Sequence, residues 1–468
     1  MKTPKLKQVA PPPNFAGVVP VPLTDETMKQ RQHKVLQKMQ ETGFDALIFY
    51  ADKEHGSNFE YLTGFFPRFE EALLVLHKDG STHYIMGNEN LKLVAHARLT
   101  GTLHHCPLFS LPNQPMDGGS VDLTSILRDC GITPQLDKLG LVGWKMFTAP
   151  LTADGSLPTQ MFDLPYFIVT AVQQAASQVT VQNAAHLLIG DGGARRLNNA
   201  NEAAHYEYGA QLAAKGMFAA LNQLAPGVSE RQLGGLLNQE GQLNNVVTIA
   251  ATGQRFEKAN FYPTDKAIRL GDPVSLTVGY KGGLSSRTGF AVENAQQLPK
   301  AQADYLEKVV YPYFKAITTW LEAAKIGVTG GQLYQEIESV YPKAVYGWHL
   351  NPGHLTADEE WLASPVYEGS TELLQSGMLL QLDLIPSMAG YQGTSTEECL
   401  LAADEKLQAQ LQADYPQLWQ RISQRRAYLI NELGIALHPD LLPMSNLVAY
   451  LPPFLLACDQ AVAWTTAE

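Results

Sequence analysis

The feature that most constrains this chain is a series of five short motifs between residues 271 and 398. The first opens with the turn Gly271-Asp272 and runs on as an apolar segment to Gly279, which predicts a buried strand. Strand signals of this kind, separated by helical patterns, predict helices that cover a sheet. In chain order the motifs are Gly271–Gly279, Leu284–Phe290, Asn351–His354, Gly377–Asp383 and Ser395–Glu398.

The 468 residues are enough for two or three domains, each with a substantial core. Residues 1–23 are proline-rich and polar, and we expect an arm there. Alternating helix and strand signals over residues 24–190 predict an α/β domain, whose first helix is capped by Thr24. Residues 191–415 predict an α+β domain, and residues 416–468 a C-terminal extension.

Two helices of the second domain are clear in the sequence. Apolar residues at helical spacing predict a helix from Asn201 to Leu224, which ends because Pro226-Gly227 cannot continue it. Ser229 and Gln232 form a capping-box pair that begins the next helix.

Charge, hydropathy and cysteine content exclude several classes of protein. The net charge of −12 argues against nucleic acid as a partner, because phosphates require a basic surface. No apolar run reaches the about 18 residues that a membrane span needs. The four cysteines lie far apart without a CxxC pair, and Pro11-Pro12-Pro13 stands where a signal peptide would be apolar, so a cytoplasmic location is expected.

The order of the motifs resembles that of the creatinase, prolidase and aminopeptidase P family. Further segments in matching order are Tyr61–Phe65, Arg195–Glu202, Ala225–Glu230 and Tyr262–Asp265. The resemblance implies a creatinase-type N-terminal α/β domain followed by a pita-bread α+β domain, and a homodimer. It also implies a hydrolase that acts on Xaa-Pro peptides or another small C–N bond.

In that family four carboxylates and one histidine hold two metal ions. The two glutamate positions fall on Asp383 and Glu397, and the histidine falls on His354, with His349 as the alternative. The remaining positions have changed chemistry. Thr277 occupies the first aspartate position, Ser285 or Ser286 the second, and Asn260 that of a histidine that contacts substrate. Asn260 and His349 are therefore the predicted catalytic residues.

Counting charges predicts that a two-metal centre is lost. Two divalent ions carry four positive charges, but only two carboxylates remain at the matching positions, and an uncompensated charge in a partly buried site is costly. A single Mn or Zn ion on His354, Asp383 and Glu397 fits the remaining ligands. The predicted cofactor is therefore none or one divalent metal.

Ordinary structural roles compete with these assignments. Asp383 lies in the apolar run 378–385, so it needs a buried partner: His354, Arg287 or a metal. Residues 358–361 are predicted as a solvated face with one aromatic anchor, with the mouth of a pocket as the alternative. His104-His105-Cys106 are adjacent and cannot converge on one ion, so they predict a strand or surface segment.

Three functions remain open. The residues favour a degenerate family member that binds a peptide or a small polar molecule. The second is an Xaa-Pro exopeptidase that uses a single ion. The third is a metal-free, creatinase-like hydrolase, but Asn260 lacks the acid/base chemistry of the histidine it replaces.

Overall fold

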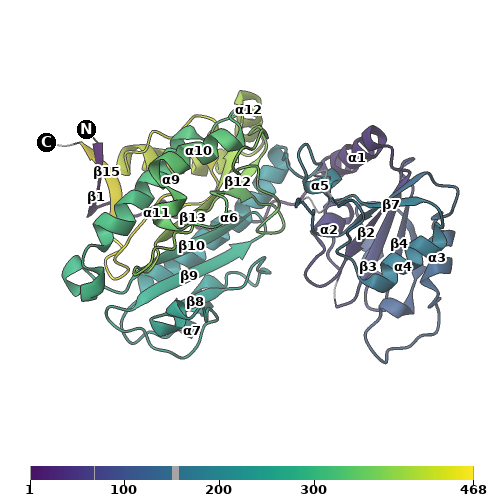
Figure 1. Ribbon diagram of the computed structural model, residues 1–468, viewed down its shortest axis with the longest axis horizontal. Helices are drawn as coiled ribbons and strands as arrows, with labels where there is room; N and C mark the ends of the chain where they lie inside the picture. The colour runs from purple at the N-terminus through teal and green to yellow at the C-terminus, as the bar shows by residue number, and fades with distance from the viewer. Residues whose placement is uncertain (1, 68, 150–157, 467–468) are drawn as a thin grey trace. The chain divides into compact units, whose positions relative to one another are not determined.

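The computed structural model describes residues 2–67, 69–149 and 158–466. The chain divides into two compact units (Figure 1). One unit comprises Leu23–Arg196, and the other combines Met1–Pro22 with Leu197–Glu468. The first is an α/β unit and the second an α+β unit, as the sequence predicts.

The first unit contains a six-stranded mixed sheet with the order β5-β4-β3-β2-β6-β7. Its strands β2 and β3 are apolar and buried except for His77 at the end of β3, as the sequence predicts. The strands are β2 Ala46–Ala51, β3 Ala72–His77, β4 Thr82–Met86, β5 Thr102–His105, β6 Lys138–Val142 and β7 Thr180–Asn183.

Helices pack on this sheet to form its core. Alternate residues of β2, such as Ala46 and Ile48, share a buried cluster with residues of α3 and α4. Thr24 caps α1 by accepting a hydrogen bond from the Thr27 backbone, which confirms the predicted helix start. The helices are α1 Asp25–Thr42, α2 Ser57–Thr63, α3 Leu123–Asp129, α4 Tyr166–Ala175 and α5 His186–Ile189, with short 3-10 turns at Leu91–His96 and Pro107–Phe109.

The second unit contains a seven-stranded sheet with the path β11-β12-β13-β10-β9-β8, and β14 pairs with β13 beside that path. All its neighbouring strands are antiparallel. The strands are β8 Ile249–Thr252, β9 Pro273–Tyr280, β10 Gly283–Phe290, β11 His354–Leu355, β12 Leu379–Leu382, β13 Ser395–Ala402 and β14 Leu441–Pro443.

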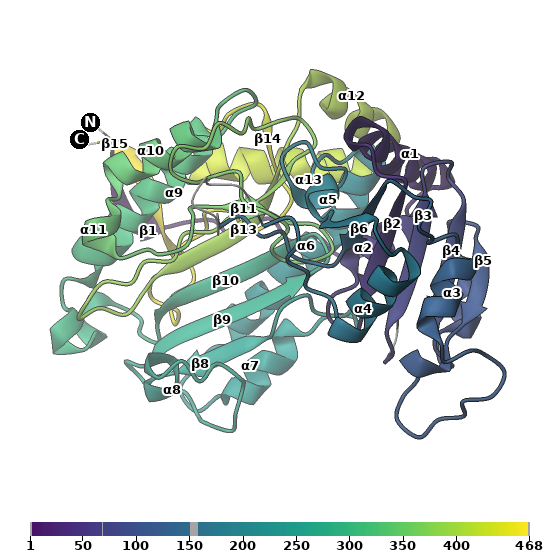
Figure 2. The same ribbon diagram turned by 45° about the vertical axis from the view of Figure 1, so that its right-hand side comes forward.

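The longest helix, α6, packs along β9 and β10 (Figure 2). It spans Ala200–Gln223, as its apolar spacing predicts, and α7 begins with the predicted Ser229–Gln232 capping box. The other helices are α7 Glu230–Leu237, α8 Gln254–Glu257, α9 Tyr311–Ala323, α10 Gly330–Val340, α11 Lys343–Tyr346, α12 Glu405–Asp414 and α13 Pro416–Ala427. Short 3-10 turns cover Ala295–Gln297 and Lys300–Gln302, and π-helical turns cover Leu306–Val310 and Tyr428–Glu432.

Both ends of the chain lie in the second unit, side by side (Figure 1). Strand β1, Lys2–Gln8, pairs antiparallel with β15, Gln460–Thr466, from Lys2 opposite Thr466 to Gln8 opposite Gln460. Among the described helices, none is long and apolar enough to cross a membrane.

Candidate metal centre

One face of the second sheet carries a row of polar side chains across neighbouring strands. The register places Thr277 of β9 opposite Ser286 of β10, and Ser286 opposite Glu397 of β13. On the other side of β13, Leu382 pairs with Glu398, so Asp383 follows at the level of Glu397. Because successive side chains alternate between faces, these residues line one surface of the sheet.

Hydroxyl groups make up much of this surface. Thr277 Oγ1 and Ser286 Oγ lie 2.9 Å apart, and Ser286 Oγ lies 3.4 Å from Ser395 Oγ. Ser395 Oγ in turn donates to Thr288 Oγ1 at 3.1 Å. We call Thr277, Ser286, Thr288 and Ser395 the hydroxyl row. Each is only 7–9% exposed, so the row is a nearly buried polar surface.

Beside the hydroxyl row lies a compact set of three ligand residues. His354, Asp383 and Glu397 each offer a ligand atom, and these atoms all lie within 4.8 Å of one another. His354 is fully buried, and the two carboxylates are 5% and 7% exposed. The structure therefore brings together the three residues that the sequence predicts as a single-ion set.

Glu360 is a further carboxylate at this set, one that the sequence prediction missed. Its Oε1 lies 3.0 Å from His354 Nε2, without the alignment of a hydrogen bond. The backbone between them folds back, because Leu355 N donates to Ala363 O and Leu362 N donates to Leu355 O. Because of this short hairpin, Glu360 lies beside His354, which is only six residues earlier in the chain.

The neighbouring residues correct the prediction of a solvated face at 358–361. Asp358 is buried and accepts a hydrogen bond from the Tyr206 hydroxyl. The Trp361 ring stacks on the His354 imidazole with 4.1 Å between centroids. Trp361 is 40% exposed, so one face of the aromatic ring covers the histidine while the rest meets solvent.

The pKa values of all three ligand residues are raised. Burial, only partly offset by His354, raises the pKa of Asp383 to about 6. Burial and the neighbouring Asp383 and Glu360 carboxylates raise the pKa of Glu397 well above its usual value. Burial alone would lower the pKa of His354, but Glu360 and Asp383 outweigh it, so that pKa is raised. A bound cation would lower the pKa of both acids, because its positive charge stabilises their ionised forms.

On the opposite face of the same strands, the charge of the Glu398 carboxylate is balanced by Arg287. Glu398 pairs with Arg287 at 2.9 Å, and both side chains are 1% exposed. Ser285 and Ser445 also donate hydrogen bonds to the Glu398 carboxylate. Ser285 therefore serves the Arg287–Glu398 pair, whereas Ser286 lies in the row with Thr277 and Glu397.

Two residues predicted as catalytic lie apart from the ligand set. His349 is exposed in the segment after α11 and is not one of the grouped ligand residues. Asn260 is exposed in the loop after α8, where its carbonyl accepts a hydrogen bond from Arg255 at 2.9 Å. Between the two candidate histidines, the structure groups His354 with the carboxylates.

The ligand set has donor atoms that can hold a metal ion. His354 Nε2 and Asp383 Oδ1 are buried and have no hydrogen-bond partner among the described residues. Buried polar atoms are normally satisfied, so the unpartnered Asp383 Oδ1 indicates space for a bound partner, while His354 Nε2 faces the Glu360 carboxylate at 3.0 Å. One imidazole with carboxylates is an adequate donor set for Zn²⁺ or Mn²⁺.

Comparison with known proteins identifies the family. Metallopeptidase family M24 matches residues 204–384, which include His354 and Asp383. The creatinase/prolidase N-terminal domain matches residues 31–132. The chain belongs to the creatinase/prolidase family, metallopeptidase family M24. No curated protein sequence matches it.

Solved structures share the fold at low sequence identity. The Xaa-Pro dipeptidase from Bacillus anthracis is 17% identical with a TM-score of 0.60, over 81% of this chain and 96% of that one. The prolidase from Thermococcus sibiricus is 18% identical with a TM-score of 0.62, over 81% and 95%. The X-Pro aminopeptidase from Thermotoga maritima MSB8 is 15% identical with a TM-score of 0.60, over 80% and 95%.

Proposed function

We propose that this chain is a family member without a two-metal centre, which holds one divalent ion and binds a peptide or small polar ligand over the hydroxyl row. The observation that carries the proposal is the row itself. Thr277 and Ser286 hydrogen-bond to each other at 2.9 Å, at the positions where the resemblance implies two aspartates. Neutral hydroxyls supply no charge to hold a second divalent ion.

The remaining ligands support one ion. Asp383 and Glu397 together balance one divalent charge, and His354 adds a neutral donor. Glu360 lies 3.0 Å from His354 Nε2, with 21% of its side chain exposed, so we assign it to the histidine rather than to a second ion. The proposal therefore places the single ion at the His354 end of the polar face.

The hydroxyl row supports recognition of a polar ligand. Each Ser or Thr hydroxyl can donate one hydrogen bond and accept others, so the row can adapt to hydroxyl, amide or carboxylate groups. Because the row is nearly buried, a ligand that reaches it must be small or extended. A peptide terminus or another compact polar molecule meets both requirements.

Binding of Mn²⁺ to the full-length protein tests the proposal, because Mn²⁺ favours carboxylate and imidazole over thiolate. After chelation and Mn²⁺ titration, electron paramagnetic resonance should show one isolated ion per chain. Glu397→Gln should remove at least about nine-tenths of this binding, since it deletes an anionic ligand from a buried site. The exposed Glu368→Gln variant is the matched control and should bind like wild type. An exchange-coupled pair of Mn²⁺ ions would overturn the proposal.

A second candidate function is an Xaa-Pro exopeptidase with a single ion. The unpartnered Asp383 Oδ1 beside His354 favours it, because a metal bound there would activate water. It predicts release of the first residue from an Xaa-Pro dipeptide with Mn²⁺ or Zn²⁺, and loss of release with chelator. If the Mn²⁺-loaded protein binds the dipeptide without cleaving it, the binding function stands and this candidate fails.

A further inference from the structure

Three histidines line one face of the first unit's sheet, far in sequence from the motifs of the second unit. The register sets Val75 of β3 opposite His83 of β4, and Ile85 of β4 opposite His104 of β5. Since His77 is two residues after Val75, and Ile85 two after His83, His77, His83 and His104 share a face. Ile85 belongs to the core cluster with α3 and α4, so the histidines lie on the helix-covered side.

A cysteine from α3 completes this group. Cys130 is the residue that ends α3, and its side chain is buried and free of disulfide bonding. His77 holds the turn in place, because its Nε2 lies 2.7 Å from the Cys130 carbonyl oxygen. The next residue, Gly131, has φ 82°, and a Cβ there would lie 3.1 Å from the His77 ring. The glycine thus allows the turn to close against the sheet.

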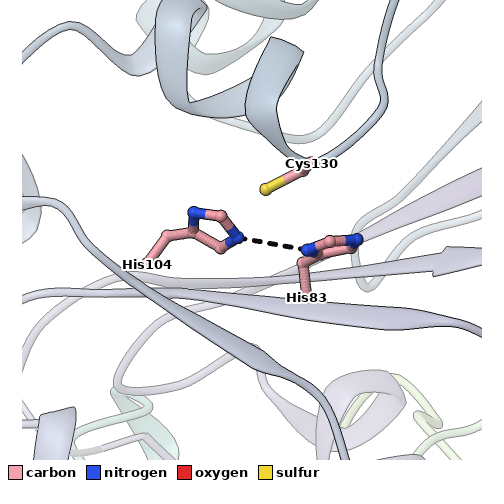
Figure 3. Close-up of side chains that lie close together, drawn as sticks. All are labelled: His83, His104 and Cys130. Carbon is pink, nitrogen blue, oxygen red and sulfur yellow. Dashed lines mark hydrogen bonds between the residues drawn. The ribbon is translucent and has the colours of Figure 1, made fainter.

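The side chains of His83, His104 and Cys130 point toward one another (Figure 3). His83 Nδ1 and His104 Nε2 lie 3.1 Å apart, joined by a hydrogen bond. With Cys130 Sγ, the three ligand atoms all lie within 4.8 Å of one another. Tetrahedral Zn²⁺ with bonds of about 2.1–2.3 Å needs ligand atoms about 3.4–3.8 Å apart, so small movements suffice.

We infer that His83, His104 and Cys130 form a second metal site, which binds one Zn²⁺ or a similar thiophilic divalent ion. Two imidazoles and a thiolate are a donor set that suits Zn²⁺, and the fourth position is open to water or a ligand. When the ion binds, the proton between the two histidines moves to the other nitrogen of its own ring, so both imidazoles stay neutral, and the thiol proton of Cys130 passes to solvent.

The surroundings suit a cation. Zn²⁺ on two neutral imidazoles and one thiolate leaves a single positive charge. Asp129 and Asp79 are close enough to act electrostatically on His104 and His83. Burial and the neighbouring imidazoles lower the pKa of His83, and burial lowers that of His104, so both histidines are in the neutral form that binds metals. Both are also partly exposed, which leaves a path from solvent.

This site differs in chemistry from the candidate centre of the second unit. That centre offers one imidazole and carboxylates, whereas this site includes a thiolate. Thiolate bound to Co²⁺ gives an intense near-ultraviolet charge-transfer band, which oxygen and nitrogen ligands do not give. Co²⁺ is therefore a probe that reports on the thiolate site alone, whatever binds at His354.

The experiment titrates chelated full-length protein with Co²⁺ and then adds Zn²⁺. Wild type should develop the charge-transfer band, and Zn²⁺ should abolish the band by displacement. His104→Gln should weaken Co²⁺ binding at this site at least about tenfold, since it removes one of three ligands. His105→Gln is the matched control. It changes the next residue of β5, whose Nε2 lies 2.7 Å from Asn88 Oδ1, and it should leave the band unchanged.

A second variant, Cys130→Ser, allows the test to be read from two independent substitutions. Cys130→Ser removes the thiolate and should abolish the band, while circular dichroism reports whether the buried substitution is tolerated. Should Cys130→Ser unfold, the partly exposed His104→Gln variant decides alone. Absence of the band in wild type would overturn the inference, as would a band of equal strength in folded His104→Gln.

Discussion

At the scale of the residue, Thr277 and Ser286 decide what the polar face can hold. Their hydroxyls bond to each other at 2.9 Å, in place of the carboxylates implied by the family resemblance. Exchange of a carboxylate for a hydroxyl removes a full charge and a strong ligand while keeping the strand intact. Under the proposed function, the strands of the sheet are kept while the chemistry of the row is changed.

Restoring those charges should restore a second ion. In the double variant Thr277→Asp with Ser286→Asp, two adjacent carboxylates face Glu397 across the row, and we expect the Mn²⁺ stoichiometry to rise from one to two per chain. The matched control is Thr277→Asp with Ser285→Asp, in which the second aspartate faces Glu398 instead. Equilibrium dialysis with metal analysis measures the number. A ratio that stays at one in the row variant, with the fold intact, would show that charge is not what limits the site.

Asp383 should make the metal-free protein sensitive to pH. Its folded pKa of about 6 lies above the ordinary 3.8, so the folded state holds the proton more tightly than the unfolded state. Its contribution to stability is therefore full below the unfolded pKa and is lost as the pH rises through the folded pKa. Asp383→Asn should raise the free energy of unfolding at pH 7 by about 1–3 kcal/mol and change it little at pH 4.

Urea unfolding in chelator at the two pH values measures this difference. Saturating Mn²⁺ should reverse the order at pH 7, because only the wild-type carboxylate stabilises the fold by binding the ion. A variant no more stable than wild type at pH 7 without metal would contradict the raised pKa.

At the scale of the element, strand register explains how much of the site the sequence could reveal. The buried strands and the positions of Asp383 and Glu397 follow from the motifs. The choice between Ser285 and Ser286 does not, because a shift of one residue moves a side chain to the other face. Only the pairing of Ser286 with Glu397 makes that choice.

The sequence could not reveal contacts between residues that come from separate segments and meet only in the folded chain. Glu360 reaches His354 through a short hairpin whose hydrogen bonds are not encoded in a recognisable turn motif. His83, His104 and Cys130 come from two strands and a helix end, so no spacing such as CxxC marks them. The sequence predicts a strand or surface segment at His104-His105, and both residues lie in β5, but the partner of His104 lies 21 residues away.

The first turn of α7 offers a test of element packing. Glu230 is fully buried there, and its carboxylate accepts hydrogen bonds from Thr252, Thr264 and Arg255. Glu230→Gln places an amide donor against these donors, so we expect about 3 kcal/mol of lost stability in urea unfolding. The exposed first-turn residue of α12 is the control, and Glu405→Gln should cost less than about 1 kcal/mol. Equal losses would mean that the Glu230 network does not stabilise the packing.

At the scale of the whole molecule, the two chain ends belong to one unit through the pairing of β1 with β15. Along β15, Val462 N donates to Leu451 O and Trp464 N donates to Leu433 O, away from β1. Alternation along the strand directs the amides of Ala461 and Ala463 toward β1. The N-terminal strand β1 therefore supplies the hydrogen-bonding partner of β15, which lies more than 450 residues further along the chain.

Deletion of residues 1–9 should expose that ladder. Amide hydrogen exchange at Ala461 and Ala463 should accelerate at least about tenfold, because their acceptors are removed. Amides of β13, which pairs with β10 and β12, should keep their protection and serve as the internal control. Unchanged exchange at Ala461 and Ala463 would contradict the role given to β1.

The most direct test of the central claim is a crystal structure of the protein soaked in Mn²⁺, with anomalous scattering recorded at the manganese edge. The account predicts one anomalous peak in the second unit, within ligand distance of His354, Asp383 and Glu397. Two strong peaks on that face, with the second beside Thr277 and Ser286, would contradict it.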